Sequence, residues 1–314
     1  MGLGLLAGLA GRAEARMPAA VIEAPTLFLG LARTLPGLVD ALASGPCRAV
    51  GWAAFGRLEN GVLARSTPGL FVRSPDSWGT PETVAGLRRV ATEVESLFPG
   101  RGDLVVTDIS RREGGHLRPH KTHQNGRDVD VLLYRDGPGE GARGARDLDV
   151  ERTWALVMLL RSAGDVDTIL MDRGVQARVL NYARGVLHRP QAELDEIFQI
   201  VHGGTRKGAD ALCKHAPGHR THLHLRFKSP RAEADAVAYD RARGVERLMY
   251  VALRGDTLQT VASRFSTTPQ DITLENRLGP RTRLSRGERL FVLRPLPQGV
   301  VRQGGHPPTD AQGG

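Results

Sequence analysis

Two short segments decide how this chain folds, His120-Lys-Thr-His-Gln-Asn-Gly-Arg-Asp-Val-Asp130 and His219-Arg-Thr-His-Leu-His224. They hold five of the ten histidines of the chain. Imidazole nitrogen and carboxylate oxygen are ligands that zinc takes in tetrahedral sites, and a catalytic site leaves one position for water. The two segments therefore predict a metal site that brings distant parts of the chain together.

Each segment runs into a predicted strand, residues 128–133 in the first case and 222–227 in the second. Side chains two residues apart on a strand point to the same face, so the two aspartates of the first strand project together, as do the two histidines of the second. If the strands are neighbours, His123, Asp130 and His224 converge on one point. Three ligands and a water form the catalytic zinc pattern.

Either pair alone has a simpler explanation. A His-x-His pair is more often an ordinary half-buried strand face, and an Asp-x-Asp pair is usually a solvated edge or a helix cap. Here both pairs lie beside further histidines, His120 and His219, and beside Gly115, Gly126 and Gly218, which permit tight turns. The combination favours the metal site.

Length and charge limit the class of protein. The 314 residues suffice for one well-buried core and a small module. The net charge of +9 suits a polyanionic partner such as nucleic acid, an anionic membrane or an acidic cell-wall polymer. Because the arginines are scattered, no nucleic-acid-binding arm is predicted. The sequence also has no run of ~18 apolar residues, so no membrane-spanning helix is predicted.

The N-terminal residues 1–50 resemble the remnant of an export signal, with a cleavage-like triplet Ala13-Glu-Ala15 but no basic region before it. Cys47 and Cys213 are too few for a Cys-type zinc site. They form a disulfide if the protein is exported, or they are two separate buried thiols, and the sequence leaves both open.

The order of predicted elements favours an α+β fold rather than a doubly wound sheet. Thr80-Pro-Glu82 predicts the start of a helix that continues to Phe98. Other predicted elements are strands 104–109 and 166–171 and helices 149–163 and 175–187. The polar residues 229–245 are predicted to be a linker, and residues 299–314 a disordered tail.

The segment Gly114–Val131 resembles the core motif of the penicillin-insensitive murein endopeptidases. These belong to a metallopeptidase group that also contains lysostaphin, the D-Ala-D-Ala metallopeptidases and the hedgehog domain. The group shares a His, six residues, an Asp and a later His-x-His. Segments 78–82, 151–157 and 216–226 support the resemblance, which covers roughly residues 50–228. It implies a domain at 51–228 with a mixed or antiparallel central sheet flanked by helices.

The resemblance also implies a role for each member of the two segments. His123, Asp130 and His224 hold Zn²⁺, His222 resembles a catalytic residue beside the water, and His219 resembles a second active-site histidine.

His120 resembles a residue that takes part in an additional metal site, which Asp147 or Asp149 would complete. The implied reaction is hydrolysis of D-Ala–meso-diaminopimelate cross-links in peptidoglycan by a periplasmic or secreted enzyme.

Residues 246–298 resemble a LysM module, which binds glycan that contains N-acetylglucosamine. Segments Met249–Phe265, Thr268–Asn276 and Leu284–Val292 match its strand, helix, helix, strand order, with Asp256 or Thr257 as a helix cap. The alternative is a small βααβ domain that only dimerises or stabilises. The expected glycan contacts are Gly255, Asp256, Thr257, Leu258, Leu278 and Gly279.

Two other functions remain open at this level. One is a D,D-carboxypeptidase or dipeptidase of the same superfamily, which would prefer D-Ala-D-Ala dipeptide to cross-linked muropeptides. The other is a wall-binding protein that keeps a silent zinc site, and it would hydrolyse neither.

Overall fold

The computed structural model describes residues 45–201, 204–205 and 210–297. The predicted tail 299–314 and most of the predicted N-terminal segment 1–50 lie outside the described residues. Everything described belongs to one compact unit of the chain.

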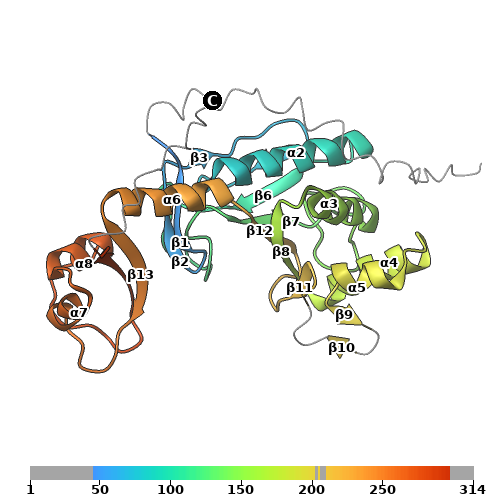
Figure 1. Ribbon diagram of the computed structural model, residues 1–314. Helices are drawn as coiled ribbons and strands as arrows, with labels where there is room; N and C mark the ends of the chain where they lie inside the picture. Colours follow the sequence, from blue (N-terminus) through green and yellow to red (C-terminus); the bar gives the residue numbers. More distant parts are fainter. Residues whose placement is uncertain (1–44, 202–203, 206–209, 298–314) are drawn as a thin grey trace, which may run out of the picture. The chain divides into compact units, whose positions relative to one another are not determined.

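A mixed six-stranded sheet forms the centre of the predicted enzyme domain, in the order β11-β8-β12-β7-β6-β4 (Figure 1). Its strands are β4 (Leu70–Val72), β6 (Leu104–Asp108), β7 (Asp128–Leu132), β8 (Val166–Met171), β11 (Cys213–His215) and β12 (His222–Phe227). Strand β12 pairs antiparallel with β7 and β8, whereas β4–β6 and β11–β8 are parallel pairs. The α+β class and the mixed sheet are confirmed.

The two middle strands bury apolar side chains on one face. Val129, Val131, Leu223 and Leu225 are each at most 1% exposed. Because side chains alternate along a strand, the aspartates and histidines between them project to the opposite face. Burial of the apolar face thus fixes which way the polar residues point.

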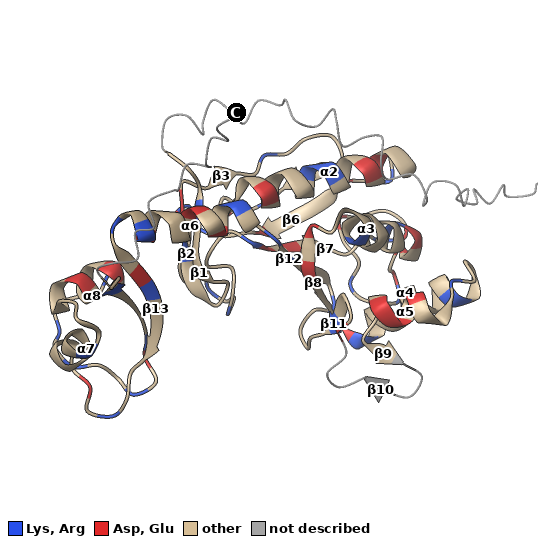
Figure 2. Ribbon diagram, viewed as in Figure 1, with Lys and Arg blue, Asp and Glu red and all other residues tan. Residues whose placement is uncertain are grey.

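Helices α2 (Pro81–Leu97), α3 (Val150–Ala163), α4 (Arg173–Gly185) and α5 (Gln191–Ile197) pack in succession, α2 against α3, α3 against α4 and α4 against α5. Thr80 caps α2 as predicted, since its side chain accepts a hydrogen bond from the backbone N–H of Thr83. Basic and acidic residues are interspersed along α2 (Figure 2). No helix in the described part of the chain is long and apolar enough to cross a membrane.

Three small antiparallel sheets flank the centre: β1 (Arg48–Trp52) with β2 (Phe55–Glu59), β3 (Val62–Leu63) with β5 (Trp78–Gly79), and β9 (Ile200–Val201) with β10 (Gly204–Thr205). The β1–β2 hairpin holds the loop of the first His segment. The backbone N–H of Gln124 donates to Ala53 at 3.1 Å, and the side chain of Asn125 donates to Gly51 at 3.3 Å. The sequence did not predict this support.

The predicted linker 229–245 is mostly helical in the structure. Helix α6 (Pro230–Ala242) occupies it, and Ala232, Ala236 and Asp240 are buried. The sequence analysis did not predict this helix, because its narrow buried face lies within a segment that is polar overall.

The C-terminal unit follows as β13 (Val245–Val251), α7 (Leu258–Phe265), α8 (Pro269–Glu275) and β14 (Arg289–Pro295). Its two strands pair antiparallel around a small core of its own. Thr257, one of the two predicted caps, forms a capping box with Thr260 at the start of α7. The βααβ order is as expected.

Both cysteines are free thiols, so the disulfide alternative is not realised. Burial raises the pKa of Cys47 to about 12 and raises that of Cys213 further. The two thiols are therefore protonated and unreactive near neutral pH.

Gly114, six residues before the first His segment, lies against Arg57 of β2, and its φ is 65°. A Cβ atom there would lie 2.2 Å from the carbonyl oxygen of Gln124 and 2.4 Å from the backbone nitrogen of Leu58. We expect Gly114→Ala to lower the free energy of unfolding by about 2 kcal/mol or more, measured by chemical denaturation.

Gly100 is the matched control, because its φ is 71° but a Cβ atom there would have no neighbour within 4 Å. Gly100→Ala should cost only about 1 kcal/mol, from the backbone conformation alone. Equal losses in the two variants would contradict the proposed close approach.

Candidate metal centre

The pairing of β7 with β12 brings the two His segments together. Its register places His224 opposite Asp130 and Arg226 opposite Asp128. His123 reaches the same place from the loop before β7 and is 1% exposed. The condition on which the sequence prediction depended, that the two strands are neighbours, is met.

Three potential ligand atoms converge at this point. Nε2 of His123 and Nδ1 of His224 lie 3.3 and 2.9 Å from Oδ1 of Asp130, and 3.2 Å from each other. Zinc bonds of about 2.0–2.2 Å in a tetrahedron place ligand atoms roughly 3.3 Å apart. The three atoms are therefore spaced as the ligand atoms of a tetrahedral metal ion would be.

The non-ligating nitrogen of each histidine also faces an acceptor. Nδ1 of His123 lies 2.8 Å from the carbonyl oxygen of Ile109. Nε2 of His224 lies 3.2 Å from Oδ2 of Asp128. Metal-binding histidines usually have such partners, which orient the ring. The Asp-x-Asp pattern placed Asp128 on the right face but did not predict this role.

His123 itself has an unusual backbone, with a φ of 68°. Non-glycine residues rarely adopt this left-handed conformation, and those that do are often found at functional sites. Gly115, Gly126 and Gly218, which the sequence marked as turn positions, also have positive φ values of 75°, 75° and 92°.

His120 lies on the other side of Asp130. Its Nδ1 is 3.3 Å from Oδ2 of Asp130, and its Nε2 is 3.5 Å from Oδ2 of Asp108. A ligand atom from each of His120, His123 and Asp130 lies within 4.8 Å of the others, so this trio also forms a possible metal-binding cluster.

Asp147 and Asp149, the two aspartates expected to complete the His120 site, make contacts elsewhere. Asp149 caps α3 and pairs with Arg152 at 2.7 Å, and Asp147 accepts from the backbone of Arg143. Asp108, at the end of β6, lies beside His120 together with Asp130. Sequence reasoning missed it because the β6–β7 pairing that brings it there is non-local.

The two remaining histidines lie next to the three convergent atoms and are partly exposed. Nε2 of His222 is 3.7 Å from Oδ2 of Asp130. The ring of His219 is 4.8 Å from that of His222 and 5.8 Å from that of His224, centre to centre. All five histidines singled out from the sequence therefore belong to one cluster.

The electrostatics of this cluster favour a bound cation. Burial alone would raise the pKa of Asp130, but His123 and His224 outweigh it and hold the pKa well below its usual range. Burial would lower the pKa of His224, but Asp128 and Asp130 outweigh it and raise the pKa to about 9. Burial is also the main reason that the pKa of His222 is lowered.

Comparison with known proteins gives a family match that includes part of this cluster. The family model of the penicillin-insensitive murein endopeptidases matches residues 70–189. The match contains His120, His123 and Asp130 and ends before the segment that carries His222 and His224. No curated protein matches the sequence.

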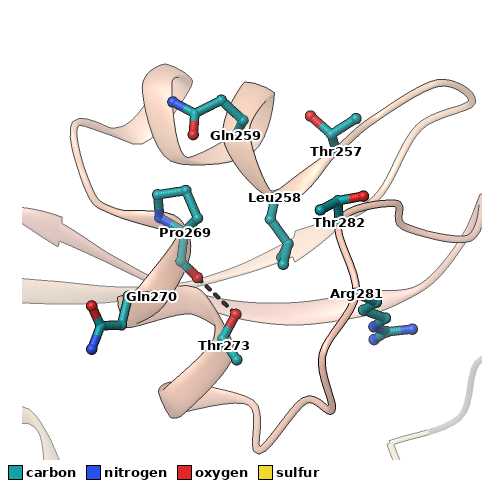
Figure 3. A pocket seen from close by; sticks show the side chains of 8 residues that line it. All are labelled: Thr257, Leu258, Gln259, Pro269, Gln270, Thr273, Arg281 and Thr282. Atoms are coloured by element: carbon teal, nitrogen blue, oxygen red, sulfur yellow. Dashed lines mark hydrogen bonds between the residues drawn. The ribbon is translucent and has the colours of Figure 1, made fainter.

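The C-terminal unit has a cavity of about 410 Å³ between α7, α8 and the loop before β14 (Figure 3). Of the six expected glycan contacts, Thr257 and Leu258 line it. The carboxylate of Asp256 is instead engaged within the unit, since it accepts from Tyr250 and from the backbone of Leu253. The other lining residues are Gln259, Pro269, Gln270, Thr273, Arg281 and Thr282.

The raised pKa of His224 predicts how metal affinity depends on pH. With a pKa of about 9 in the metal-free protein, the imidazole is protonated near neutral pH, and a metal must displace that proton. We expect the affinity to rise about tenfold per pH unit from pH ~6 to ~8 and to level off above ~9. Chelator competition across this range measures it, and an affinity independent of pH would contradict the assignment.

Proposed function

We propose that this protein is a zinc-dependent murein endopeptidase that hydrolyses D-Ala–meso-diaminopimelate cross-links of peptidoglycan. The observation that carries the proposal is the convergence of His123 Nε2, Asp130 Oδ1 and His224 Nδ1 within 3.3 Å of one another. Two of the three residues lie in the stretch that the murein endopeptidase model matches.

The chemistry of the donor set supports zinc. Two imidazole nitrogens 3.2 Å apart beside one carboxylate oxygen form a borderline set of ligands, and Mg²⁺ and Ca²⁺ prefer oxygen alone. Three protein ligands leave a fourth tetrahedral position free, which is the arrangement of catalytic rather than structural zinc. When bound, zinc supplies a Lewis acid that polarises a peptide carbonyl and makes water nucleophilic near neutral pH.

His222 is the residue proposed to move the proton. Its lowered pKa keeps the imidazole neutral at neutral pH, so that Nε2 can accept a proton from the attacking water. The same nitrogen then donates that proton to the leaving amine. His219, whose ring lies 4.8 Å from that of His222, is the residue proposed to donate a hydrogen bond to the carbonyl oxygen as negative charge develops on it.

The roles of ligand and proton carrier are separable by mutation. We expect His222→Ala to retain zinc and lose about 100-fold or more of the turnover on cross-linked muropeptides. His123→Ala and His224→Ala should lose both zinc and activity, because each removes a ligand. Metal analysis of the purified proteins, run beside the activity assay, tests both expectations.

His116→Ala is the matched control, because His116 is an exposed residue of the loop that carries His123 but lies outside the histidine cluster. It should retain zinc and activity. An active His224→Ala protein would overturn the proposed ligand set. If the wild-type protein cleaves D-Ala-D-Ala dipeptide but not muropeptide dimers, it is a D,D-carboxypeptidase or dipeptidase instead.

We further propose that the C-terminal unit is a LysM module that holds the enzyme on the wall glycan, and that the protein acts in the periplasm or outside the cell. The βααβ order and the cavity between α7 and α8 support the first part. Besides the charged Arg281, the cavity is lined by Gln259, Gln270 and Thr282, whose amide and hydroxyl groups suit the hydroxyls of a sugar (Figure 3).

Peptidoglycan binding tests the module in the full-length protein. In a His222→Ala background, which prevents digestion, the protein should sediment with insoluble peptidoglycan. Adding Gln259→Ala and Gln270→Ala should weaken this binding about tenfold or more, because two hydrogen-bonding groups of the cavity are lost. Ser263→Ala changes an exposed residue of α7 that does not line the cavity, so this variant should bind normally. Equal binding by all three proteins would exclude the cavity as the glycan site.

A further inference from the structure

Asp128 is a fully buried carboxylate that contacts a histidine in addition to the arginine with which it forms an ion pair. Its two oxygens accept from Nε and Nη2 of Arg226 at 2.8 and 2.9 Å, across the β7–β12 pair. The same carboxylate also faces His224, with Oδ2 3.2 Å from Nε2 of the imidazole. Its side chain is 0% exposed, so no solvent competes for these contacts.

The position of one proton on His224 decides whether this residue can bind a metal. A neutral imidazole has one N–H and one lone pair. Nδ1 is the nitrogen that lies among the other two ligand atoms, so the proton must be on Nε2 when a metal is bound. An ionised carboxylate only accepts hydrogen bonds, and one facing Nε2 selects that tautomer.

We infer that Asp128 is a positioning residue that fixes the tautomer and ring orientation of His224. This inference rests on the proposed metal-binding role of His224 but not on the proposed substrate. His123 meets the same requirement differently, because its non-ligating Nδ1 faces the backbone carbonyl of Ile109. For His224 the acceptor is a side chain, and mutation can therefore change it.

Replacing Asp128 with Asn should change which group faces Nε2 of His224, now 3.2 Å from a carboxylate oxygen. The guanidinium of Arg226 can only donate, so it takes the amide oxygen of the new side chain and directs the NH₂ group toward Nε2. An NH₂ group facing Nε2 favours the tautomer with the proton on Nδ1, which cannot ligate. A wrong tautomer of this kind inactivates the Ser-His-Asp triad when its Asp becomes Asn.

The experiment measures zinc affinity of the full-length protein by competition with a chromophoric chelator. We expect Asp128→Asn to bind zinc about 10- to 100-fold more weakly than wild type, the range typical for loss of an outer-shell partner. Adding Arg226→Met to Asp128→Asn should restore part of that loss, because the amide is then free to turn its oxygen toward His224.

The double variant separates the inference from a purely structural role. If the Asp128–Arg226 pair only stabilised the strands, removing the second partner would leave zinc binding unchanged or weaker. Arg226→Met alone keeps the carboxylate acceptor, so its zinc affinity should stay within about threefold of wild type, and it decides the matter if Asp128→Asn fails to fold. Circular dichroism and thermal unfolding of the metal-free proteins identify such a failure.

The outcomes also separate this inference from the proposed function. Wild-type affinity in folded Asp128→Asn, no recovery in the double variant, or a large loss in Arg226→Met alone would overturn the tautomer role. Absence of zinc binding by the wild-type protein would instead overturn the metal site itself. Neither result depends on whether the protein cleaves peptidoglycan.

Discussion

The antiparallel pairing of β7 with β12 is the constraint on which the rest of the site depends. Its register sets Asp130 opposite His224, while buried Val and Leu side chains fix the other face of both strands. A shift of one residue would turn the histidines into the apolar layer, which burial forbids. Hydrophobic packing on one face thus specifies the ligand geometry on the other, and the metal need not create it.

Periodicity was sufficient to predict these two strands and the helix that begins at Thr80, because both depend on residues close in sequence. It was not sufficient for contacts that form only when distant segments meet. Asp108 lies beside His120 only because β6 pairs with β7. The loop that carries His123 is held by the β1–β2 hairpin. Helix α6 was missed because its buried face is only two alanines and an aspartate within a polar segment.

Asp130 divides the histidine cluster between its two oxygens. Oδ1 faces His123 and His224, and Oδ2 faces His120 and His222. One carboxylate therefore contacts both the convergent ligand atoms and the proposed proton carrier. This shared contact helps four of the five histidines to lie close together, because their imidazoles surround the carboxylate of Asp130. His120 and His224 also face the carboxylates of Asp108 and Asp128.

The left-handed backbone of His123 has a consequence for how this protein can evolve. At a φ of 68°, glycine or asparagine would relax the backbone, whereas only a residue with a suitable donor atom can fill the ligand position. Selection for stability and selection for the proposed metal binding therefore favour different residues at this position. A homologous domain that had lost its metal would be free to replace this histidine, so glycine or asparagine here would mark descendants that had given up the chemistry while keeping the fold.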